Sequence, residues 1–350
     1  MGKRIMIMAG GTGGHVFPAL AVAQYLRSKD WDVSWLGTEK GLEARVIPEN
    51  NIEIDWLSVS GLRGKGILFK FKSIFLLVKA CWQAFKHLRT RKPDVVLGMG
   101  GFVAAPGGLM AKVLGIPLVI HEQNRVVGTT NKLLAKIARR VLEAFPESFP
   151  AKRKALCCGN PLREAFSNLP EKALKNETQA LNILVVGGSQ GAQILNQVVP
   201  EALAKLKNIS VRHQTGSVMQ SEVASNYQTL NVDAKAVAFI DDMADAYQWA
   251  DLVVCRAGAM TVSEVSACSL PVIFIPLPHA IDDHQTANAH YLADAGAALI
   301  LPQKELTAAS LSAAITQISN NLETMAKASK NKARLDATAM VADICIEVAA

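Results

Sequence analysis

The chain has 350 residues, 50% of them hydrophobic and 19% charged, which supplies enough apolar material for two packed domains and excludes a disordered chain. Its formal net charge of +7 favours an anionic partner without identifying one. The sequence lacks a long uncharged apolar run, and its first residues predict a strand rather than an export signal. We therefore expect a cytoplasmic protein without a membrane span.

The chain opens with an apolar strand, a glycine turn and an apolar helix. Residues 3–9 predict a buried parallel strand, residues 10–14 a sharp turn, and residues 17–23 a helix. Unpaired amides at such a helix start favour negative charge by about 0.3–1 kcal/mol. The segment therefore predicts an anion-binding site.

A basic and apolar segment follows at residues 61–92. Large apolar residues recur there near helical spacing, while lysines and arginines make the segment too charged to span a bilayer. One apolar stripe packed on a sheet explains part of this pattern, but Leu68, Phe69 and Leu76 extend it to other sides of the helix. Two interpretations stay open, a core helix and a patch that binds a membrane surface.

The remaining chain alternates strand-like and helical runs, which predicts an α/β fold with parallel sheets covered by helices. The expected strands are residues 32–36, 95–97, 118–121, 183–186, 210–214, 236–239, 252–255 and 272–275.

The arrangement of the first segment returns near mid-chain, where an apolar strand precedes a glycine turn at residues 187–191 and a helix from Ala192. Two further glycine clusters follow strands, GMGGFVAAPGG and CRAGAMTVSE. We therefore predict two similar halves, separated within the proline- and lysine-containing stretch 159–179. The apolar face of the final helix fits either half.

The glycine turns match neither common nucleotide template. No cluster supplies the GxxxxGK of a P-loop, and GxGxxG counted from Gly11 ends on Val16 instead of glycine. This disfavours an NTP hydrolase and a nicotinamide dehydrogenase. Two doubly wound domains instead suggest a donor nucleotide in one half and an acceptor in the other.

Side chains with metal or redox chemistry are scattered. The six cysteines form no CxxC pair, so we expect reduced thiols. His279, Asp283, His284 and His290 lie close in sequence, but their spacing matches no zinc template. We expect no metal site.

Nine segments in order resemble the MurG family of cell-wall glycosyltransferases over about residues 3–297. They are GGTGGHVFPALAVA, SGLRGKG, PDVVLGMGGFVAAPGG, HEQNRVVGTTNK, GNPLR, VVGGSQGA, FIDDMADAY, CRAGAMTVSE and DDHQTANA. The resemblance implies transfer of N-acetylglucosamine (GlcNAc) from UDP-GlcNAc to lipid I, giving lipid II for peptidoglycan synthesis, without a metal or other cofactor and without nucleic acid. The alternatives are a non-catalytic, membrane-associated nucleotide-sugar binding protein and another nucleotide-sugar enzyme of the same architecture.

The resemblance also implies the GT-B architecture, two Rossmann-like domains of parallel sheets facing a central cleft. Residues 1–160 with 336–350 would form the acceptor and membrane-associated domain, and residues 161–335 the UDP-GlcNAc donor-binding domain. In this family the enzyme lies peripherally on the cytoplasmic face of the bacterial inner membrane.

The site residues implied by the resemblance fall into a donor set and an acceptor set. Ser189 would contact the donor diphosphate, the backbone near Ile240 the uracil, and Glu264 the ribose hydroxyls. The donor set is Thr12, Gly13, Gly14, Asn124, Arg163, Ser189, Ile240, Arg256, Ala259, Met260, Thr261, Val262, Ser263, Glu264, Gln285 and Asn288. The acceptor set is Gly13, Gly14, His15, Gly100, Gly101 and Asn131.

The family's reaction inverts the sugar, since the muramyl 4-hydroxyl of lipid I attacks the anomeric carbon opposite the departing UDP. His15 is the expected base because imidazole accepts a proton near neutral pH, and Glu122 is the competing candidate. Amides at residues 188–192 and Arg256 would stabilise the departing UDP.

A membrane-anchored acceptor gives the basic apolar segment a function. We expect it to seat the first domain on the anionic leaflet. The residues of this patch are Ile67, Leu68, Phe71, Phe75, Arg63, Lys65, Lys70 and Lys72.

Overall fold

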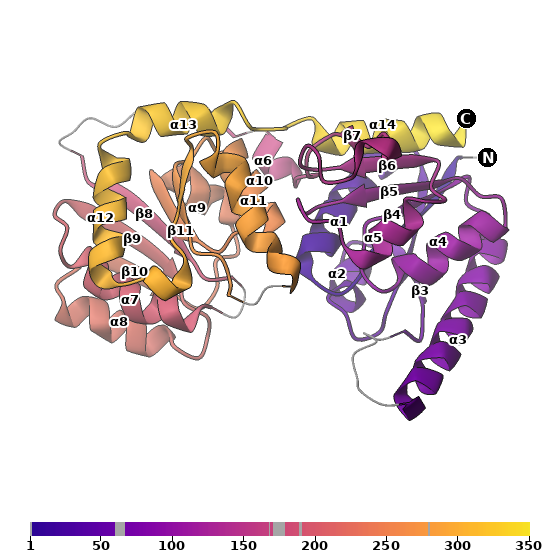
Figure 1. The fold of residues 1–350 in the computed structure, drawn as a ribbon, viewed down its shortest axis with the longest axis horizontal. Helices are drawn as coiled ribbons and strands as arrows, with labels where there is room; N and C mark the ends of the chain where they lie inside the picture. The colour runs from indigo at the N-terminus through magenta and orange to yellow at the C-terminus, as the bar shows by residue number, and fades with distance from the viewer. Residues whose placement is uncertain (1, 60–66, 168, 171–178, 189–190, 279–280) are drawn as a thin grey trace. The chain divides into compact units, whose positions relative to one another are not determined.

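The computed structural model describes residues 2–59, 67–167, 169–170, 179–188, 191–278 and 281–350, with the backbone alone for residues 67–74, 167 and 281. The chain divides into two compact units (Figure 1). Unit 1 comprises Met1–Arg163 and Leu335–Ala350, and unit 2 comprises Glu164–Arg334. Each unit is built on one parallel sheet, as the alternation of strands and helices predicted.

The sheet of unit 1 has seven strands in the order β3-β2-β1-β4-β5-β6-β7, all parallel. The order reverses beside β1, so the loops after β1 and β4 lie next to each other at the carboxyl edge, where ligands of such sheets bind. The strands are β1 Arg4–Met8, β2 Asp32–Gly37, β3 Glu53–Trp56, β4 Val95–Gly98, β5 Leu118–Glu122, β6 Arg140–Glu143 and β7 Leu156–Cys157.

Helices cover both faces of this sheet. Because side chains alternate along a strand, Ile5 and Ile7 pack in one core with α1 and α14, while Met6 and Met8 pack in the other with α3, α4 and α5. The helices of unit 1 are α1 Gly13–Arg27, α2 Glu43–Glu49, α3 Ile67–Arg91, α4 Ala104–Val113, α5 Thr129–Leu134, the 3-10 helix η1 Ala151–Arg153, and α14 Ala337–Ala349.

The final helix, α14, belongs to unit 1 although the chain reaches it through unit 2. It packs against α1, and Val341, Ala342 and Cys345 are fully buried there. Lys3 also donates a hydrogen bond to the carbonyl oxygen of Ala349, at 2.6 Å. The apolar face of α14, which the sequence could not assign to either half, therefore completes the core of unit 1 beside β1.

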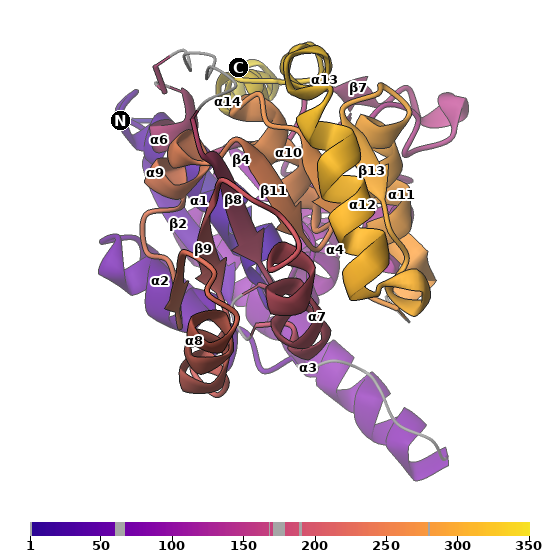
Figure 2. The same ribbon diagram turned by 90° about the vertical axis from the view of Figure 1, so that its left-hand side faces the viewer.

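Unit 2 repeats the architecture with six parallel strands in the order β10-β9-β8-β11-β12-β13, which confirms the two similar halves (Figures 1 and 2). Its strands are β8 Leu181–Val186, β9 Ile209–Gln214, β10 Ala234–Val237, β11 Leu252–Cys255, β12 Val272–Phe274 and β13 Ala298–Ile300. Its helices are α6 Glu164–Ser167, α7 Gln193–Leu203, α8 Gln220–Thr229, α9 Met243–Trp249, α10 Ala259–Ala267, η2 Ile281–Asp283, α11 His284–Ala293, η3 Gln303–Glu305, α12 Ala308–Ser319 and α13 Leu322–Lys330.

Candidate functional site

The first glycine turn joins β1 to α1 at the carboxyl edge of the sheet in unit 1. Gly11 has a φ of 95°, a conformation that favours glycine. Thr12 is the N-cap of α1, but its side chain does not cap the helix, and the first turn carries no acidic residue. The amides of Gly13 and Gly14 begin a helix whose positive end is therefore not neutralised by its own side chains.

The turn after β4 packs directly against this first turn. A Cβ atom at Gly101 would lie 2.5 Å from the carbonyl oxygen of Gly10, and one at Gly100 would lie 2.9 Å from Cδ2 of His15. Only glycine allows the two backbones this approach. The structure thus brings the predicted acceptor residues His15, Gly100 and Gly101 together.

A buried carboxylate that the sequence analysis missed holds the first turn in place. Glu43, fully buried at the start of α2, accepts a hydrogen bond from the amide of Gly11 at 2.9 Å. Its other oxygen accepts the amide of Thr38 at 3.0 Å and the Thr38 hydroxyl at 2.7 Å. Glu43 therefore ties the turns after β1 and β2 together.

Glu122, the competing base, lies at the end of β5 and is 2% exposed. One oxygen accepts the backbone and side-chain amides of Asn124, at 3.0 and 3.3 Å. The other accepts the amide of Gly128 and the side chain of Asn131, both at 3.0 Å. Its two oxygens thus organise the loop that carries Asn124 and the start of α5.

A buried polar network lies beside Glu122. His121 is fully buried, and burial lowers its pKa to about 4, so the ring is neutral at pH 7. Its Nε2 lies 2.9 Å from the carbonyl oxygen of Gly159, which requires the proton on Nε2, and its Nδ1 accepts from Gln123 at 3.3 Å. Asn160 donates to the carbonyl oxygen of Gln123 at 3.1 Å. The network joins β5 to the segment that leaves unit 1.

In unit 2 the glycine turn after β8 is built in the same way. A Cβ atom at Gly191 would lie 2.0 Å from the carbonyl oxygen of Thr215, so only glycine fits. Gln214, buried at the end of β9, donates to the carbonyl oxygen of Gly188 at 2.8 Å and accepts the amide of Ile240 at 2.9 Å. Gln214, which the sequence analysis also missed, therefore connects the two predicted donor-binding loops.

The predicted ribose carboxylate, Glu264, lies on α10. The Tyr247 hydroxyl donates to it at 3.4 Å, and burial together with this carboxylate raises the pKa of Tyr247 well above its ordinary value. The predicted residues Ala259, Met260, Thr261, Val262 and Ser263 form the first turns of the same helix, which follows the N-cap Gly258.

Arg256 occupies the turn between β11 and α10. Its guanidinium group donates to the carbonyl oxygens of Ile275 at 3.0 Å and Pro276 at 3.3 Å, and to the side chain of Gln303 at 2.8 Å. Partial burial lowers the pKa of this group. Arg256 thus brings a cation to the carboxyl edge of the sheet in unit 2.

The remaining donor residues are divided between the units. Asn288 is fully buried and donates to the carbonyl oxygen of Ala257 at 3.3 Å, while the Gln285 side chain accepts the amide of Leu277 at 2.9 Å. Arg163, in unit 1, stacks over the ring of Phe17 at 5.8 Å. Ser189 lies outside the described residues.

The described part of α3 exposes a second apolar face. Phe75, Val78 and Trp82 are 69%, 62% and 61% exposed. The opposite side, with Ala84 and Leu88 buried, packs against α4. Among the described helices, none is both long and apolar enough to cross a bilayer. Seven predicted patch residues lie outside the described side chains, namely Ile67, Leu68, Phe71, Arg63, Lys65, Lys70 and Lys72.

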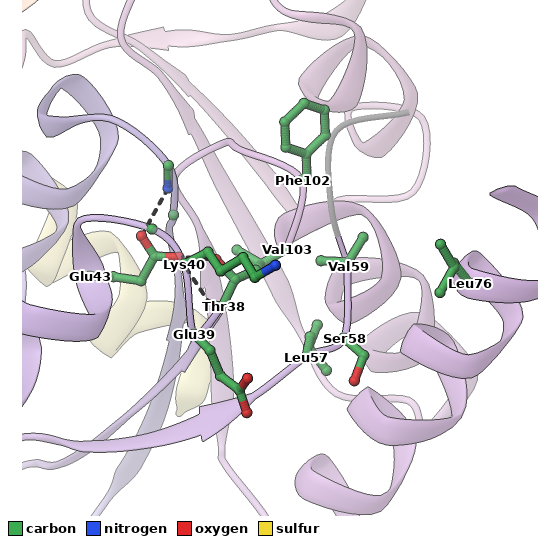
Figure 3. Close-up of a pocket in the computed structure, with 13 residues that line it drawn as sticks. Thr38, Glu39, Lys40, Glu43, Leu57, Ser58, Val59, Leu76, Phe102 and Val103 are labelled. Atoms are coloured by element: carbon green, nitrogen blue, oxygen red, sulfur yellow. Dashed lines mark hydrogen bonds between the residues drawn. The ribbon is translucent and has the colours of Figure 1, made fainter. Parts of the chain in front are cut away.

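A pocket of about 440 Å³ opens beside the first glycine turn (Figure 3). The loops after β1, β2, β3 and β4 contribute to it, together with Leu76 of α3. In the part of the chain that the structure describes, no group of three or more histidine, cysteine or acidic side chains is placed to hold a metal ion.

Two parallel-sheet units, each with a glycine turn after its first strand, form the GT-B architecture. Solved structures with this fold include the glycosyltransferase of kitacinnamycin, at a TM-score of 0.75 and 15% identity over 100% of both chains. A UDP-GlcNAc 2-epimerase from Neisseria meningitidis has the same fold, at a TM-score of 0.67 and 12% identity over 99% of this chain and 100% of that one.

The chain belongs to glycosyltransferase family 28. The model of the family's N-terminal domain matches residues 5–143, and that of its C-terminal domain matches residues 182–344. A Methylococcus capsulatus protein named UDP-N-acetylglucosamine--N-acetylmuramyl-(pentapeptide) pyrophosphoryl-undecaprenol N-acetylglucosamine transferase is 56% identical over 100% of this chain and 99% of its own length. The crystal structure of MurG from Acinetobacter baumannii is 40% identical, with a TM-score of 0.85 over 99% of both chains.

Proposed function

We propose that this protein transfers GlcNAc from UDP-GlcNAc to the muramyl 4-hydroxyl of lipid I, the undecaprenyl-linked acceptor. The observation that carries the proposal is the 56% identity over the full chain to a transferase named for this donor and acceptor. The glycine turns of both units, the buried carboxylate of Glu122 and the half-buried carboxylate of Glu264 supply groups that suit the two substrates.

Unit 2 binds the donor in this proposal. The turn after β8 and the first amides of α7 and α10 hold the diphosphate, because unpaired amides at helix starts favour anions. Glu264 accepts hydrogen bonds from the vicinal ribose hydroxyls. Since the amide of Ile240 is already bonded to Gln214, the uracil N–H donates to the carbonyl oxygen of Ile240.

Unit 1 binds the acceptor, with the reacting hydroxyl beside His15. The Nδ1 atom of His15 is buried, so Nε2 is the nitrogen that takes the hydroxyl proton. As the hydroxyl oxygen bonds to the anomeric carbon, the bond to the phosphate oxygen breaks and UDP leaves with the electron pair. Glu122 acts as a positioning residue, because four donors already occupy its two oxygens.

Turnover of UDP-GlcNAc with a lipid I analogue tests this function. His15→Ala should lower kcat by about 10²–10⁴-fold, the usual contribution of a general base, with little change in donor KM. Glu264→Gln should mainly raise the donor KM, because the ribose loses a charged acceptor. Binding of UDP-GlcNAc without any transfer would overturn the proposal in favour of a non-catalytic nucleotide-sugar binding protein.

We also propose that α3 seats unit 1 peripherally on the cytoplasmic face of the bacterial inner membrane. Phe75, Val78 and Trp82 form an exposed apolar face, and Lys86 lies 4.7 Å from the Trp82 ring. An apolar face bordered by lysines suits an anionic lipid surface.

Sedimentation with anionic vesicles tests this association. Trp82→Ser should reduce the bound fraction several-fold, because a large apolar ring no longer enters the lipid surface. Val218→Ser is the control, since it removes an apolar side chain that is 95% exposed but lies in unit 2. Equal losses in both variants, or no loss in Trp82→Ser, would contradict a role for α3.

A further inference from the structure

Arg256 reaches from the end of β11 across the carboxyl ends of the next two strands of unit 2. Its guanidinium group donates to the carbonyl oxygens of Ile275 and Pro276, which follow β12. It also donates to the side-chain oxygen of Gln303, which follows β13, and this bond is the shortest of the three at 2.8 Å. Two separate segments thus fix one cation at the edge of the sheet where ligands bind.

All three oxygens that hold Arg256 are neutral. Two belong to backbone carbonyl groups and the third to a carboxamide. Burial lowers the pKa of this guanidinium group, and no carboxylate among the described residues offsets that effect. Since arginine stays protonated in proteins, the half-buried group keeps a positive charge that no ion pair compensates.

The helix that follows Arg256 adds to this positive charge. The helix α10 begins three residues later, at Ala259, and its first turn carries no acidic residue. In η3, on the other side of Arg256, the charges of Lys304 and Glu305 pair with each other at 3.6 Å. A cation beside such a helix start favours a phosphate group.

The backbone around Gln303 is held in place by the start of the next helix, α12. The carbonyl oxygen of Gln303 accepts the amide of Leu306 at 3.3 Å. The Ser310 hydroxyl, on α12, donates to the carbonyl oxygen of Glu305 at 2.8 Å. A fixed turn therefore presents the side-chain oxygen of Gln303 to Arg256.

We propose that Gln303 is a positioning residue for the transfer. It holds the guanidinium group of Arg256 at the diphosphate end of the donor site through a neutral oxygen, so the whole positive charge acts on the phosphate groups. The inference rests on the proposed function, in which UDP leaves with the electron pair of the broken bond and its diphosphate gains negative charge. A carboxylate at position 303 would hold Arg256 as firmly but would cancel its charge.

Ligand-observed NMR titrations of the full chain with UDP and with uridine test this role. Gln303→Glu should weaken UDP binding about tenfold or more, because the new carboxylate neutralises Arg256 and repels phosphate. Gln303→Met, which removes the acceptor without adding charge, should weaken UDP binding several-fold. Both variants should bind uridine, which lacks phosphate, within about twofold of the unmodified chain. In the transfer assay Gln303→Glu should lower kcat, because negative charge grows on the departing UDP.

Two comparisons separate this role from a purely structural one. Gln228→Glu makes the same charge change at an exposed position of α8 and should keep UDP affinity within about twofold of the unmodified chain. In an Arg256→Gln background, Gln303→Met should cause no further loss of UDP affinity, since Gln303 acts through Arg256. The urea midpoint of Gln303→Glu should not fall, because an ion pair replaces a neutral hydrogen bond. A structural role alone predicts the reverse, a lower midpoint with equal losses for UDP and uridine.

Three results would overturn the assignment. They are UDP affinity in Gln303→Glu within about twofold of the unmodified chain, equal losses for UDP and uridine, and additive losses from Gln303→Met and Arg256→Gln. Transfer assays of the unmodified chain separate the two proposals. Transfer together with UDP binding that Gln303→Glu does not change would remove only the positioning role, whereas absence of transfer from UDP-GlcNAc to a lipid I analogue would remove the proposed function.

Discussion

Glu43 holds the first glycine turn of unit 1 through a fully buried carboxylate, so replacing it by glutamine should destabilise that unit. Glu43→Gln keeps the size of the side chain but replaces one oxygen by an amide group. The remaining oxygen can still accept both hydrogen bonds from Thr38. The new amide group then faces the amide of Gly11, so that two donors meet where one hydrogen bond existed.

The expected loss of stability follows from these contacts. A buried amide left without its acceptor costs about 1–3 kcal/mol, and each bond to Thr38 loses roughly 1 kcal/mol when its acceptor is no longer charged. Because Glu43 is fully buried, water cannot replace the lost acceptor. We expect the free energy of unfolding of unit 1 to fall by about 4 kcal/mol, within a range of about 3–5 kcal/mol.

Urea unfolding followed by circular dichroism measures this loss. Glu39→Gln is the control, since it removes the same charge from an exposed neighbour and should change stability by less than about 0.5 kcal/mol. The acceptor KM of Glu43→Gln should rise more than its donor KM, because the glycine turn of unit 1 loses its support. A stability loss below about 1 kcal/mol, or one equal to that of the control, would refute the reasoning.

Three further predictions concern buried groups in both units. Burial lowers the pKa of His213 from 6.5 to about 3. Between these two pH values the unfolded chain therefore binds a proton at His213 that the folded chain does not. Stability should therefore fall by up to about 1.4 kcal/mol for each pH unit below 6.5, and titrations of unfolding free energy against pH should show a shallower fall in His213→Gln. Burial raises the pKa of Cys158 to about 12, so this thiol stays protonated at pH 8. Alkylation at pH 8 followed by tandem mass spectrometry should therefore place the label on half-buried Cys157 before buried Cys158. Val341→Ala should lower the free energy of unfolding by about 1–3 kcal/mol, because Val341 fills the core between α14 and α1; an unchanged urea midpoint would contradict that packing.

Local patterns were sufficient for most strands and for the glycine turns. Each of the eight expected strands overlaps a strand of the structure, although β10 is Ala234–Val237 rather than residues 236–239. Four strands were missed, namely β3 and β7 at the edges of the sheet in unit 1, β6 beside β7, and β13 at an edge of the sheet in unit 2. The strands β3, β7 and β13 are two to four residues long, and their side chains are mostly half-buried or exposed, so they give a weaker local signal than the buried central strands.

The sequence by itself determined the two repeated halves, the class of fold and the glycine turns, because these depend on the spacing of residues near one another in the chain. The tertiary structure alone decided which distant side chains support those turns. Glu43 meets Gly11 from 32 residues away, and Gln214 meets Gly188 from 26 residues away. Such pairs form because sheet order places the carboxyl ends of separate strands side by side, and a buried polar group must find its partner there.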